Sequence, residues 1–207
     1  MNPIRILIID DHVVVRSGLV AYIEAEEGML VAGEASSLEE AGQLLTEGVV
    51  IDVAIIDLRL PDGSGIDLLR LLAEQHPGVR GLILSVNAGE NDVMAAVEAG
   101  TCGYLSKSVE RHELIDAIRH IAEGGSYFPA AIQRKIDAGH ARPKLTDRER
   151  GVLEGIARGR SNKEIGESLG IADITVRQHV SAVLRKLGAQ DRTQAALLAV
   201  REGHVRL

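Results

Sequence analysis

Two kinds of hydrophobic pattern divide the chain. In the first 123 residues, short runs of aliphatic and β-branched residues alternate with longer segments in which apolar positions recur every three or four residues. This alternation predicts five units of a strand followed by a helix. The expected helices cover residues 13–26, 38–47, 65–75, 90–99 and 110–123. Such a repeat is typical of an α/β doubly wound fold with a five-stranded parallel sheet.

After the fifth helix the strand pattern ends. Gly124 and Gly125 stop that helix, and residues 124–142 contain Pro129, scattered charges and one short helical stretch near residues 130–137. We interpret this segment as a linker. The helical pattern then resumes in a small all-α segment. The sequence therefore predicts a first domain over residues 1–123, a linker over 124–142 and a second domain over 143–207.

Composition narrows the function classes. Only 2% of the 207 residues are aromatic against 45% hydrophobic, which predicts aliphatic cores and disfavours a large aromatic ligand pocket. The single Cys102 excludes an intramolecular disulfide. No apolar run approaches the roughly 18 residues of a membrane span, and Asp10 and Asp11 interrupt the N-terminal apolar run before a signal peptide could form. We expect a soluble, cytoplasmic protein with no membrane partner.

Acidic residues follow two of the predicted strands. Asp10 and Asp11 come directly after the apolar run 4–9, and Asp57 follows the run 53–56. The carboxyl ends of parallel strands meet at one edge of a doubly wound sheet, so the three carboxylates converge there if the two strands are neighbours. Three like charges need a cation, and Mg²⁺ prefers carboxylates, waters and phosphate oxygens. The sequence therefore predicts a magnesium-dependent phospho-acceptor site.

A hydroxyl and an ammonium group follow the two later strands. Residues 81–84 run into Ser85, and residues 103–105 run into Ser106 and Lys107. Phosphoryl transfer to a carboxylate needs positioning and charge neutralisation, which these groups and Mg²⁺ would provide. A single Asp after a strand is more often a turn former or a helix cap. The combination of acids, hydroxyl and ammonium favours the phosphoryl site.

Charge differs between the two halves. Residues 143–207 contain 12 Lys and Arg against 8 Asp and Glu, while residues 1–142 contain 11 against 22. The net charges are thus +4 and −11, although the whole chain carries −7. A solvated charged surface explains such a difference, but so does a basic nucleic-acid-binding module joined to an acidic regulatory one.

Capping signals start two helices in the second half. Thr146 with Glu149 forms one capping box, and Ser161 with Glu164 forms another. Gly170 provides a left-handed stop for the second helix. A tight turn therefore separates this short helix from the next one, as in a helix-turn-helix motif.

The helix that follows is amphipathic. It is expected over residues 174–187, with Asp173 as its cap. One side carries an aliphatic stripe, formed by Val176, Val180, Val183 and Leu187. The other side carries polar groups, Arg177, Gln178, Ser181 and Arg185. Arg can bind guanine and Gln can bind adenine through two hydrogen bonds in the major groove. The helix alone is more typical of an ordinary surface helix.

The first half, over residues 4–123, resembles the receiver domain of two-component response regulators, which has a flavodoxin-like fold. The resemblance implies that Asp57 is phosphorylated and that Asp10 and Asp11 bind the metal. It also implies roles for Ser85 as the small hydroxyl residue, Lys107 as the basic partner of the phosphoryl group, Tyr104 as the switch aromatic and the Arg59 backbone carbonyl as a metal ligand. Ser108 departs from the proline that many receivers carry after the lysine.

Residues 144–202 resemble the LuxR-type helix-turn-helix domain in the spacing of their helices and caps. The resemblance implies that Arg177, Gln178 and Ser181 face bases. It implies DNA-backbone contacts for Ser161, Asn162, Lys163, Thr175, Arg185 and Lys186. Ser181 departs from the basic residue common at that position, and Asp147 replaces a common proline.

A receiver followed by this output domain resembles the NarL/FixJ class of response regulators. The resemblance implies a transcription regulator rather than an enzyme, with Mg²⁺ as cofactor, a sensor histidine kinase and double-stranded DNA as partners, and a homodimer on phosphorylation. In the family mechanism the acyl phosphate attracts the Ser85 hydroxyl and Tyr104 repacks inward. The changed receiver face then promotes dimerisation or releases the recognition helix.

Three alternatives remain open. A phosphohydrolase of the haloacid-dehalogenase type would also use Asp57 as nucleophile, but it needs an acid two positions later, where Arg59 stands. A quorum-sensing regulator would share the output domain, but its ligand domain should be rich in aromatic residues. A regulator that keeps the receiver fold without phosphorylation is the third alternative.

Overall fold

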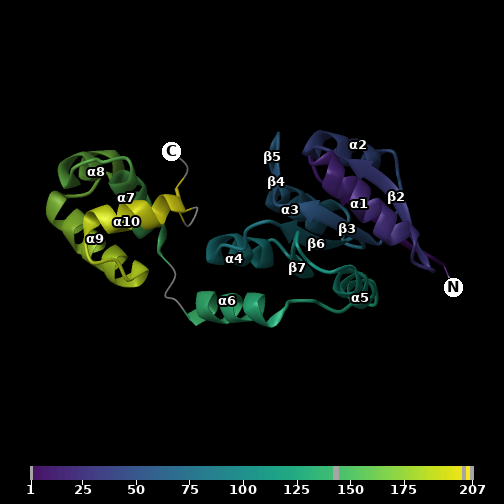
Figure 1. The fold of residues 1–207 in the computed structure, drawn as a ribbon. Helices are drawn as coiled ribbons and strands as arrows, with labels where there is room; N and C mark the ends of the chain where they lie inside the picture. Colours follow the sequence, from purple (N-terminus) through teal and green to yellow (C-terminus); the bar gives the residue numbers. More distant parts are fainter. Residues whose placement is uncertain (1, 142–144, 202–203, 206–207) are drawn as a thin grey trace. The chain divides into compact units, whose positions relative to one another are not determined.

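A computed structural model shows that the chain forms two compact units. The described residues are 2–141, 145–201 and 204–205. The larger unit comprises residues 1–88 and 93–136, and the smaller unit comprises residues 89–92 and 137–207. Figure 1 shows the α/β unit with its central sheet and the helical unit with α7 to α10.

A five-stranded parallel sheet forms the centre of the larger unit, with the order β2-β1-β3-β6-β7. Its strands are β1 (Ile4–Ile9), β2 (Met29–Ala35), β3 (Val53–Asp57), β6 (Arg80–Ser85) and β7 (Gly103–Ser106). From β1 the chain continues to β2 on one side and then to β3 on the other, so the winding direction changes between β1 and β3. The predicted α/β doubly wound fold is confirmed.

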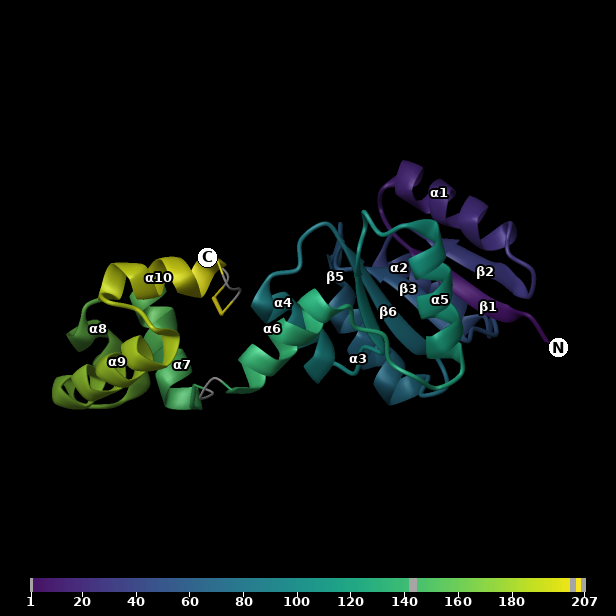
Figure 2. The same ribbon diagram turned by 60° about the horizontal axis from the view of Figure 1, so that its bottom comes forward.

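Helices cover both faces of the sheet, as Figures 1 and 2 show. The helices on one face are α1 (Val13–Glu24) and α5 (Arg111–Ala122), and those on the other are α2 (Leu38–Thr46), α3 (Gly65–Gln75) and α4 (Glu90–Glu98). Side chains of β1 alternate between the two cores: Ile6 and Ile8 pack in the α1 and α5 core, and Leu7 and Ile9 in the other. Burial on both faces explains why the strands read as continuous aliphatic runs.

The edge of the sheet at β7 is covered by chain from the predicted linker. Tyr127 forms a parallel β-bridge with Gly103. Its N–H donates to the Cys102 carbonyl at 2.8 Å, and its carbonyl accepts from the Tyr104 N–H at 3.3 Å. The segment after α5 thus satisfies backbone groups that an edge strand would leave unpaired.

Helix α6 (Ala130–Ala141) follows, and it is longer than the short helix expected near residues 130–137. Ile132 and Ile136 are buried in the same core cluster as α2, α3 and α4, and Phe128 packs against that cluster. The spacing of four residues places both isoleucines on one side of the helix. The predicted linker therefore contributes side chains to the core of the larger unit.

The smaller unit contains α7 (Asp147–Ala157), α8 (Asn162–Leu169), α9 (Asp173–Leu187) and α10 (Arg192–Arg201). Its fully buried core is aliphatic and includes Val152, Leu153, Ile156, Ile165, Val176, Val183, Ala195 and Ala199. Gly155 lies where an added Cβ would come within 2.5 Å of Ile165, so the glycine permits the close approach of α7 and α8.

The helix ends follow the predicted signals in all but one case. Both capping boxes, at Thr146 and at Ser161, are present with their reciprocal hydrogen bonds. Gly170 ends α8 with φ of 66° in the left-handed region. The prediction that Asp173 caps α9 is wrong, because Ala172 is the N-cap and Asp173 is the first helical residue. No helix in the described part of the chain is long and apolar enough to cross a bilayer.

Candidate functional site

The strand register brings the predicted phosphoryl-site residues to one edge of the sheet. Ile9 pairs with Ile56, so Asp10 and Asp57 follow neighbouring positions of β1 and β3. Asp57 pairs in turn with Leu84, the residue before Ser85. The site therefore lies at the carboxyl ends of the strands, where the order of the sheet reverses.

Lys107 joins two buried carboxylates. Its Nζ lies 2.7 Å from Asp10 Oδ2 and 2.7 Å from Asp57 Oδ2. The side chains of Lys107, Asp10 and Asp57 are 8%, 2% and 7% exposed. Burial lowers the pKa of Lys107, but hydrogen bonds and charge from both aspartates outweigh it and raise its pKa above the ordinary value. The ammonium therefore stays charged and offsets the repulsion between the two acids.

The outer part of the site offers oxygen ligands for a cation. Asp10 Oδ1 accepts the His12 N–H at 2.9 Å, and Asp57 Oδ1 accepts the Arg59 N–H at 3.3 Å. Asp11 is more open, with 36% of its side chain exposed. Ligand atoms of Asp10, Asp11, His12 and Asp57 all lie within 4.8 Å of one another. This donor set fits a divalent metal ion.

Two backbone supports of the site were missed by sequence reasoning. Arg16 on α1 donates from Nη1 to the Asp10 carbonyl at 2.5 Å and pairs through Nε with Glu34 on β2 at 3.2 Å. Gly65 lies where a Cβ would be 2.3 Å from the Asp57 carbonyl oxygen. Arg16 lies in the first turn of the helix predicted directly after the acidic pair. This position was the sequence signal that could have indicated its contact with the site.

The acceptor loop contains the short antiparallel strands β4 (Arg59–Leu60) and β5 (Gly63–Ser64). Between them, Asp62 accepts the N–H groups of Leu38 and Glu39, both at 2.9 Å, at the start of α2. These backbone hydrogen bonds lower the pKa of Asp62. The loop after Asp57 is thus tied to a neighbouring helix.

The loop after β6 is held by side chains from three elements. Ser85 Oγ and Tyr104 Oη both donate to the Asn87 carbonyl, at 2.8 and 3.1 Å. Lys135 of α6 donates to the Ala88 carbonyl. Tyr104 is fully buried, so the structure already places it in the inward position that we expected only after phosphorylation.

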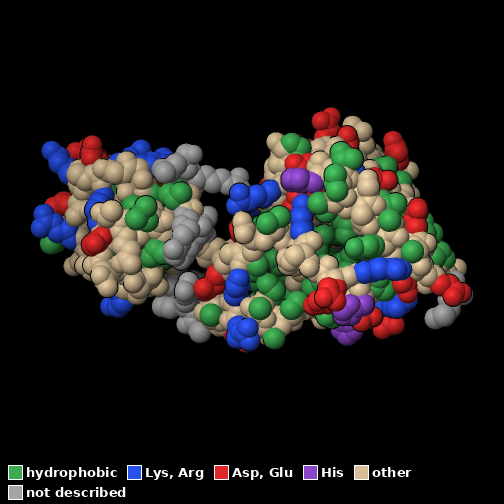
Figure 3. All heavy atoms as spheres, in the orientation of Figure 1, with side chains coloured by type: hydrophobic (Ala, Val, Ile, Leu, Met, Phe, Trp, Pro, Cys, Tyr) green, Lys and Arg blue, Asp and Glu red, His purple; other side chains and the backbone are tan. Residues whose placement is uncertain are grey.

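The predicted DNA-contacting residues lie on two helices of the smaller unit. The exposed residues on α9 include Arg177, Gln178, Ser181 and Arg185, and Ser161 and Lys163 are exposed at the start of α8. Thr175, at the start of α9, is half-buried. Lys and Arg side chains are visible on the side of this unit that carries α8 and α9 (Figure 3). The spacing of α8, the left-handed turn at Gly170 and α9 is that of a helix-turn-helix motif.

Several of these side chains have partners within the unit. Arg177 pairs with Asp173 at 2.8 Å, and the Ser181 hydroxyl donates to the Arg177 carbonyl at 3.1 Å. Arg192 donates to Asn162 Oδ1 at 2.8 Å. The Arg177–Asp173 contact is an exposed ion pair within one helix, a kind of contact that contributes little to stability.

Lys186 has a more buried partner. Its Nζ lies 2.6 Å from Glu149 Oε2, and the two side chains are 17% and 7% exposed. Burial raises the pKa of Glu149, but hydrogen bonds from Lys186 and Thr146 outweigh this effect and hold the pKa below its ordinary value. The ion pair joins α9 to the capping box of α7.

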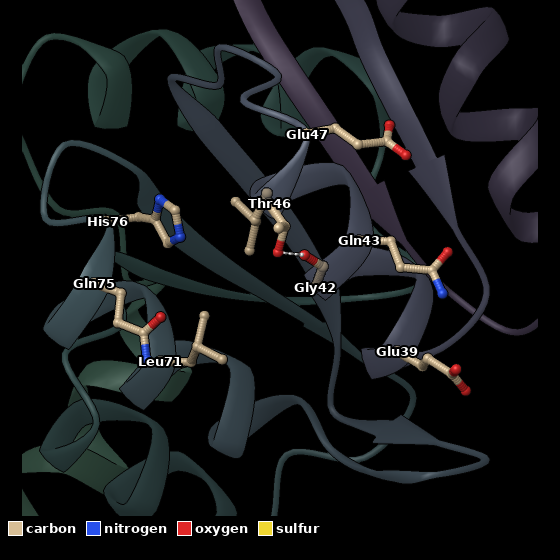
Figure 4. A pocket seen from close by; sticks show the side chains of 9 residues that line it. Glu39, Gly42, Gln43, Thr46, Glu47, Leu71, Gln75 and His76 are labelled. Atoms are coloured by element: carbon tan, nitrogen blue, oxygen red, sulfur yellow. Dashed lines mark hydrogen bonds between the residues drawn. The ribbon is translucent and has the colours of Figure 1, made fainter.

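A separate open groove lies between α2 and α3 (Figure 4). It is lined by Glu39, Gly42, Gln43, Leu45, Thr46, Glu47, Leu71, Gln75 and His76. The Thr46 hydroxyl donates to the Gly42 carbonyl at 2.8 Å, within its own helix. In Figure 4 the side chains of Glu39 and Glu47 lie well apart, so the groove does not gather a charged ligand set.

The fold and the two sites together define a class: a regulatory protein with an acidic phosphoryl-type site in an α/β unit and a helix-turn-helix output unit. Comparisons with known proteins agree with this class. Residues 6–119 match the family described as response regulator receiver domain, and residues 143–199 match bacterial regulatory proteins, luxR family.

Similar proteins extend the match over nearly the whole chain. The DNA-binding transcriptional activator DevR/DosR of Mycobacterium tuberculosis is 37% identical, over 95% of this chain and 94% of that protein. The nitrate/nitrite response regulator protein NarP of Escherichia coli is 33% identical, over 97% and 96%. The crystal structure of response regulator ChrA of a heme-sensing two-component system has a TM-score of 0.58 at 33% identity, over 99% and 100%.

A Salmonella typhimurium RcsB response regulator structure has a TM-score of 0.78 at 23% identity and covers 94% of this chain and 98% of that one. It supports the fold. The chain belongs to the two-component response regulators of the NarL/FixJ type, with a receiver domain and a LuxR-type DNA-binding domain.

Proposed function

We propose that the chain is a cytoplasmic transcriptional response regulator switched by Mg²⁺-dependent phosphorylation of Asp57, with a sensor histidine kinase as the phosphoryl donor. The observation that carries the proposal is the buried contact of Lys107 with both Asp57 and Asp10. An ion pair that only stabilises the fold needs one carboxylate. Two buried aspartates beside one ammonium, at the position where the strand order of the sheet reverses, indicate a site that binds a further charged group.

The proposed reaction is transfer of a phosphoryl group from a phosphohistidine. An Asp57 carboxylate oxygen attacks phosphorus, the P–N bond breaks, and the histidine nitrogen leaves with the bonding electrons. The Lys107 ammonium would then stabilise the negative charge on the phosphoryl oxygens. Asp10, Asp11, Asp57 and the Arg59 carbonyl would hold Mg²⁺, which supplies further positive charge for these oxygens when bound.

The switch would start at the loop after β6. The Ser85 hydroxyl now donates to the Asn87 carbonyl, and it would donate to the phosphoryl group after transfer. The Asn87 carbonyl would then lose this hydrogen bond and keep the one from Tyr104. The Ser85 hydroxyl can donate to the Asn87 carbonyl or to the phosphoryl group, but not to both at once. The phosphoryl group therefore contacts Ser85 in one state of the loop and not in the other, and a population shift requires such a difference.

Phosphorylation would promote a homodimer that reads two half-sites on double-stranded DNA. Arg177 and Gln178 are exposed on α9 and would contact base edges, and Lys163 and Arg185 would contact phosphates. Ser181 would contribute a weaker hydrogen bond after leaving the Arg177 carbonyl. We expect regulation of transcription rather than turnover of a substrate.

Incorporation of phosphate from acetyl phosphate with Mg²⁺ tests the proposal, with DNA affinity measured in parallel. Native protein should gain the mass of one phosphoryl group and bind DNA more tightly. Asp57→Asn should do neither. Asp62→Asn is the matched control, since Asp62 is in the same loop but binds the first N–H groups of α2, and it should keep the label. A folded native protein that takes up no label would refute phosphorylation and leave a phosphorylation-independent regulator.

A further inference from the structure

The mouth of the acidic site carries one nitrogen ligand, the imidazole of His12. Its Nδ1 lies 2.6 Å from Asp11 Oδ1 and 3.4 Å from Asp10 Oδ1. His12 is the N-cap residue of α1, but its side chain makes no capping hydrogen bond, and 64% of it is exposed. The ring is therefore directed at the acids without being packed in the core.

The inner and outer parts of the site differ in what they offer a cation. Lys107 occupies Oδ2 of both Asp10 and Asp57 in the buried part. A metal ion therefore meets the remaining oxygens on the solvent side, where Asp11 is 36% exposed and His12 lies against it. Any ion that binds Asp11 Oδ1 must either displace the imidazole or accept it as a ligand.

The spacing fits the second outcome. Neighbouring ligands of a six-coordinate ion with bonds of about 2.1 Å lie about 3 Å apart. The two distances from Nδ1 to the aspartate oxygens, 2.6 and 3.4 Å, lie on either side of that value. Imidazole nitrogen suits first-row transition ions, whereas Mg²⁺ prefers oxygen ligands and retained water.

We propose that His12 is a nitrogen ligand that, together with Asp11 and Asp57, strengthens the binding of a divalent first-row transition ion at this site without contributing to the binding of Mg²⁺. The inference rests on the metal site of the proposed function and adds a metal class to it. The oxygen ligands are shared by both kinds of ion, and His12 contributes to the transition ion alone.

Cobalt is a suitable probe, because its visible absorption changes with nitrogen ligation. Full-length protein would be titrated with Co²⁺ and, separately, with Mg²⁺ at one fixed pH, by visible absorption and calorimetry. The variant is His12→Asn, since Asn is a strong N-cap residue and should preserve α1. His112→Asn is the matched control, because His112 is 75% exposed and lies 3.2 Å from Glu110, outside the acidic site.

We expect His12→Asn to weaken Co²⁺ binding by about tenfold or more and to change the cobalt spectrum, with Mg²⁺ affinity within about twofold of the native value. His112→Asn should match the native protein in both titrations. Asp11→Asn should weaken both ions, which shows that the titrations report this site.

An unchanged Co²⁺ affinity and spectrum in His12→Asn would overturn the inference, as would tighter binding of both ions, which would make His12 a competitor for the acids. Phosphate labelling of the native protein with Mg²⁺ is read separately. Loss of that label with an intact cobalt difference would refute the proposed phosphorylation and leave the role of His12 standing.

Discussion

Replacing Lys186 with Met distinguishes the contact seen within the smaller unit from the DNA contact that the family resemblance implies. The change removes the ammonium that lies 2.6 Å from Glu149 and keeps most of the aliphatic stem. Glu149 is 7% exposed, so its carboxylate would lose its charged partner in a poorly hydrated position. The helices that carry the pair, α7 and α9, should therefore become less stable.

The size of the effect follows from burial. Breaking a buried ion pair costs about 3–5 kcal/mol, and water near the 17% exposed Lys186 reduces this to about 2–3 kcal/mol. That change corresponds to an increase of about 30- to 150-fold in the opening equilibrium. The lowered pKa of Glu149 stabilises the unit above the ordinary value of 4.5, and this stabilisation is lost as pH falls through the lowered folded-state pKa. Native and variant proteins should therefore converge only as pH falls below this lowered pKa of Glu149.

Native-state amide hydrogen exchange can measure this, because it reports the stability of α7 and α9 within the full two-unit chain. Arg185→Met is the matched control, since Arg185 is the exposed neighbour of Lys186. It should leave exchange unchanged and reduce the salt dependence of DNA binding by about one charge. If Lys186→Met left exchange at pH 7 unchanged and weakened only DNA binding, the reasoning from the Glu149 pair would be wrong.

Three further changes test supports of the phosphoryl site. Gly65→Ala should destabilise the protein by about 1–3 kcal/mol in thermal unfolding and reduce labelling of Asp57, because the new Cβ would meet the Asp57 carbonyl at 2.3 Å; unchanged stability would contradict the tight packing. Arg16→Gln should weaken Mg²⁺ binding several-fold by calorimetry, because the Asp10 carbonyl loses its guanidinium partner, with Arg16→Lys restoring part of the affinity; equal binding by all three proteins would remove Arg16 from the site. Lys135→Met should speed amide exchange in residues 86–88 while the Met stem preserves packing, and unaltered exchange there would show that α6 does not restrain the loop.

Local sequence rules predicted much of the fold and the elements of the site. Strand runs, the capping boxes at Thr146 and Ser161 and the glycine stop at Gly170 act within a few residues, so the sequence carries them directly. The convergence of Asp10 with Asp57 followed from the rule for parallel sheets. The ends of the five helices expected in the first 123 residues were placed within two residues, a difference that the fraying of end turns explains, whereas α6 extends four residues beyond its expected end.

The missed features depend on contacts between distant residues. Helical periodicity places Lys186 near the polar side of α9, but only folding reveals Glu149, 37 positions away, as its partner. The same holds for Arg16 and Glu34, which join α1 to β2. Asp173 was wrongly predicted as the cap because the actual N-cap, Ala172, has no polar side chain that would mark it in the sequence. Asp173 lies in the first turn of α9 instead, where its negative charge stabilises the helix N-terminus.

The pairing of Tyr127 with the edge of β7 changes where the receiver could be cut without damage. A fragment that ends at residue 123 would lose the segment that covers the edge of the sheet and the helix that buries Ile132 and Ile136. Its uncovered strand could pair with a second copy, and the exposed core side chains would favour the same association. Self-association of such a fragment would then be mistaken for the natural dimer, whereas a fragment that continues through residue 136 would avoid the artefact.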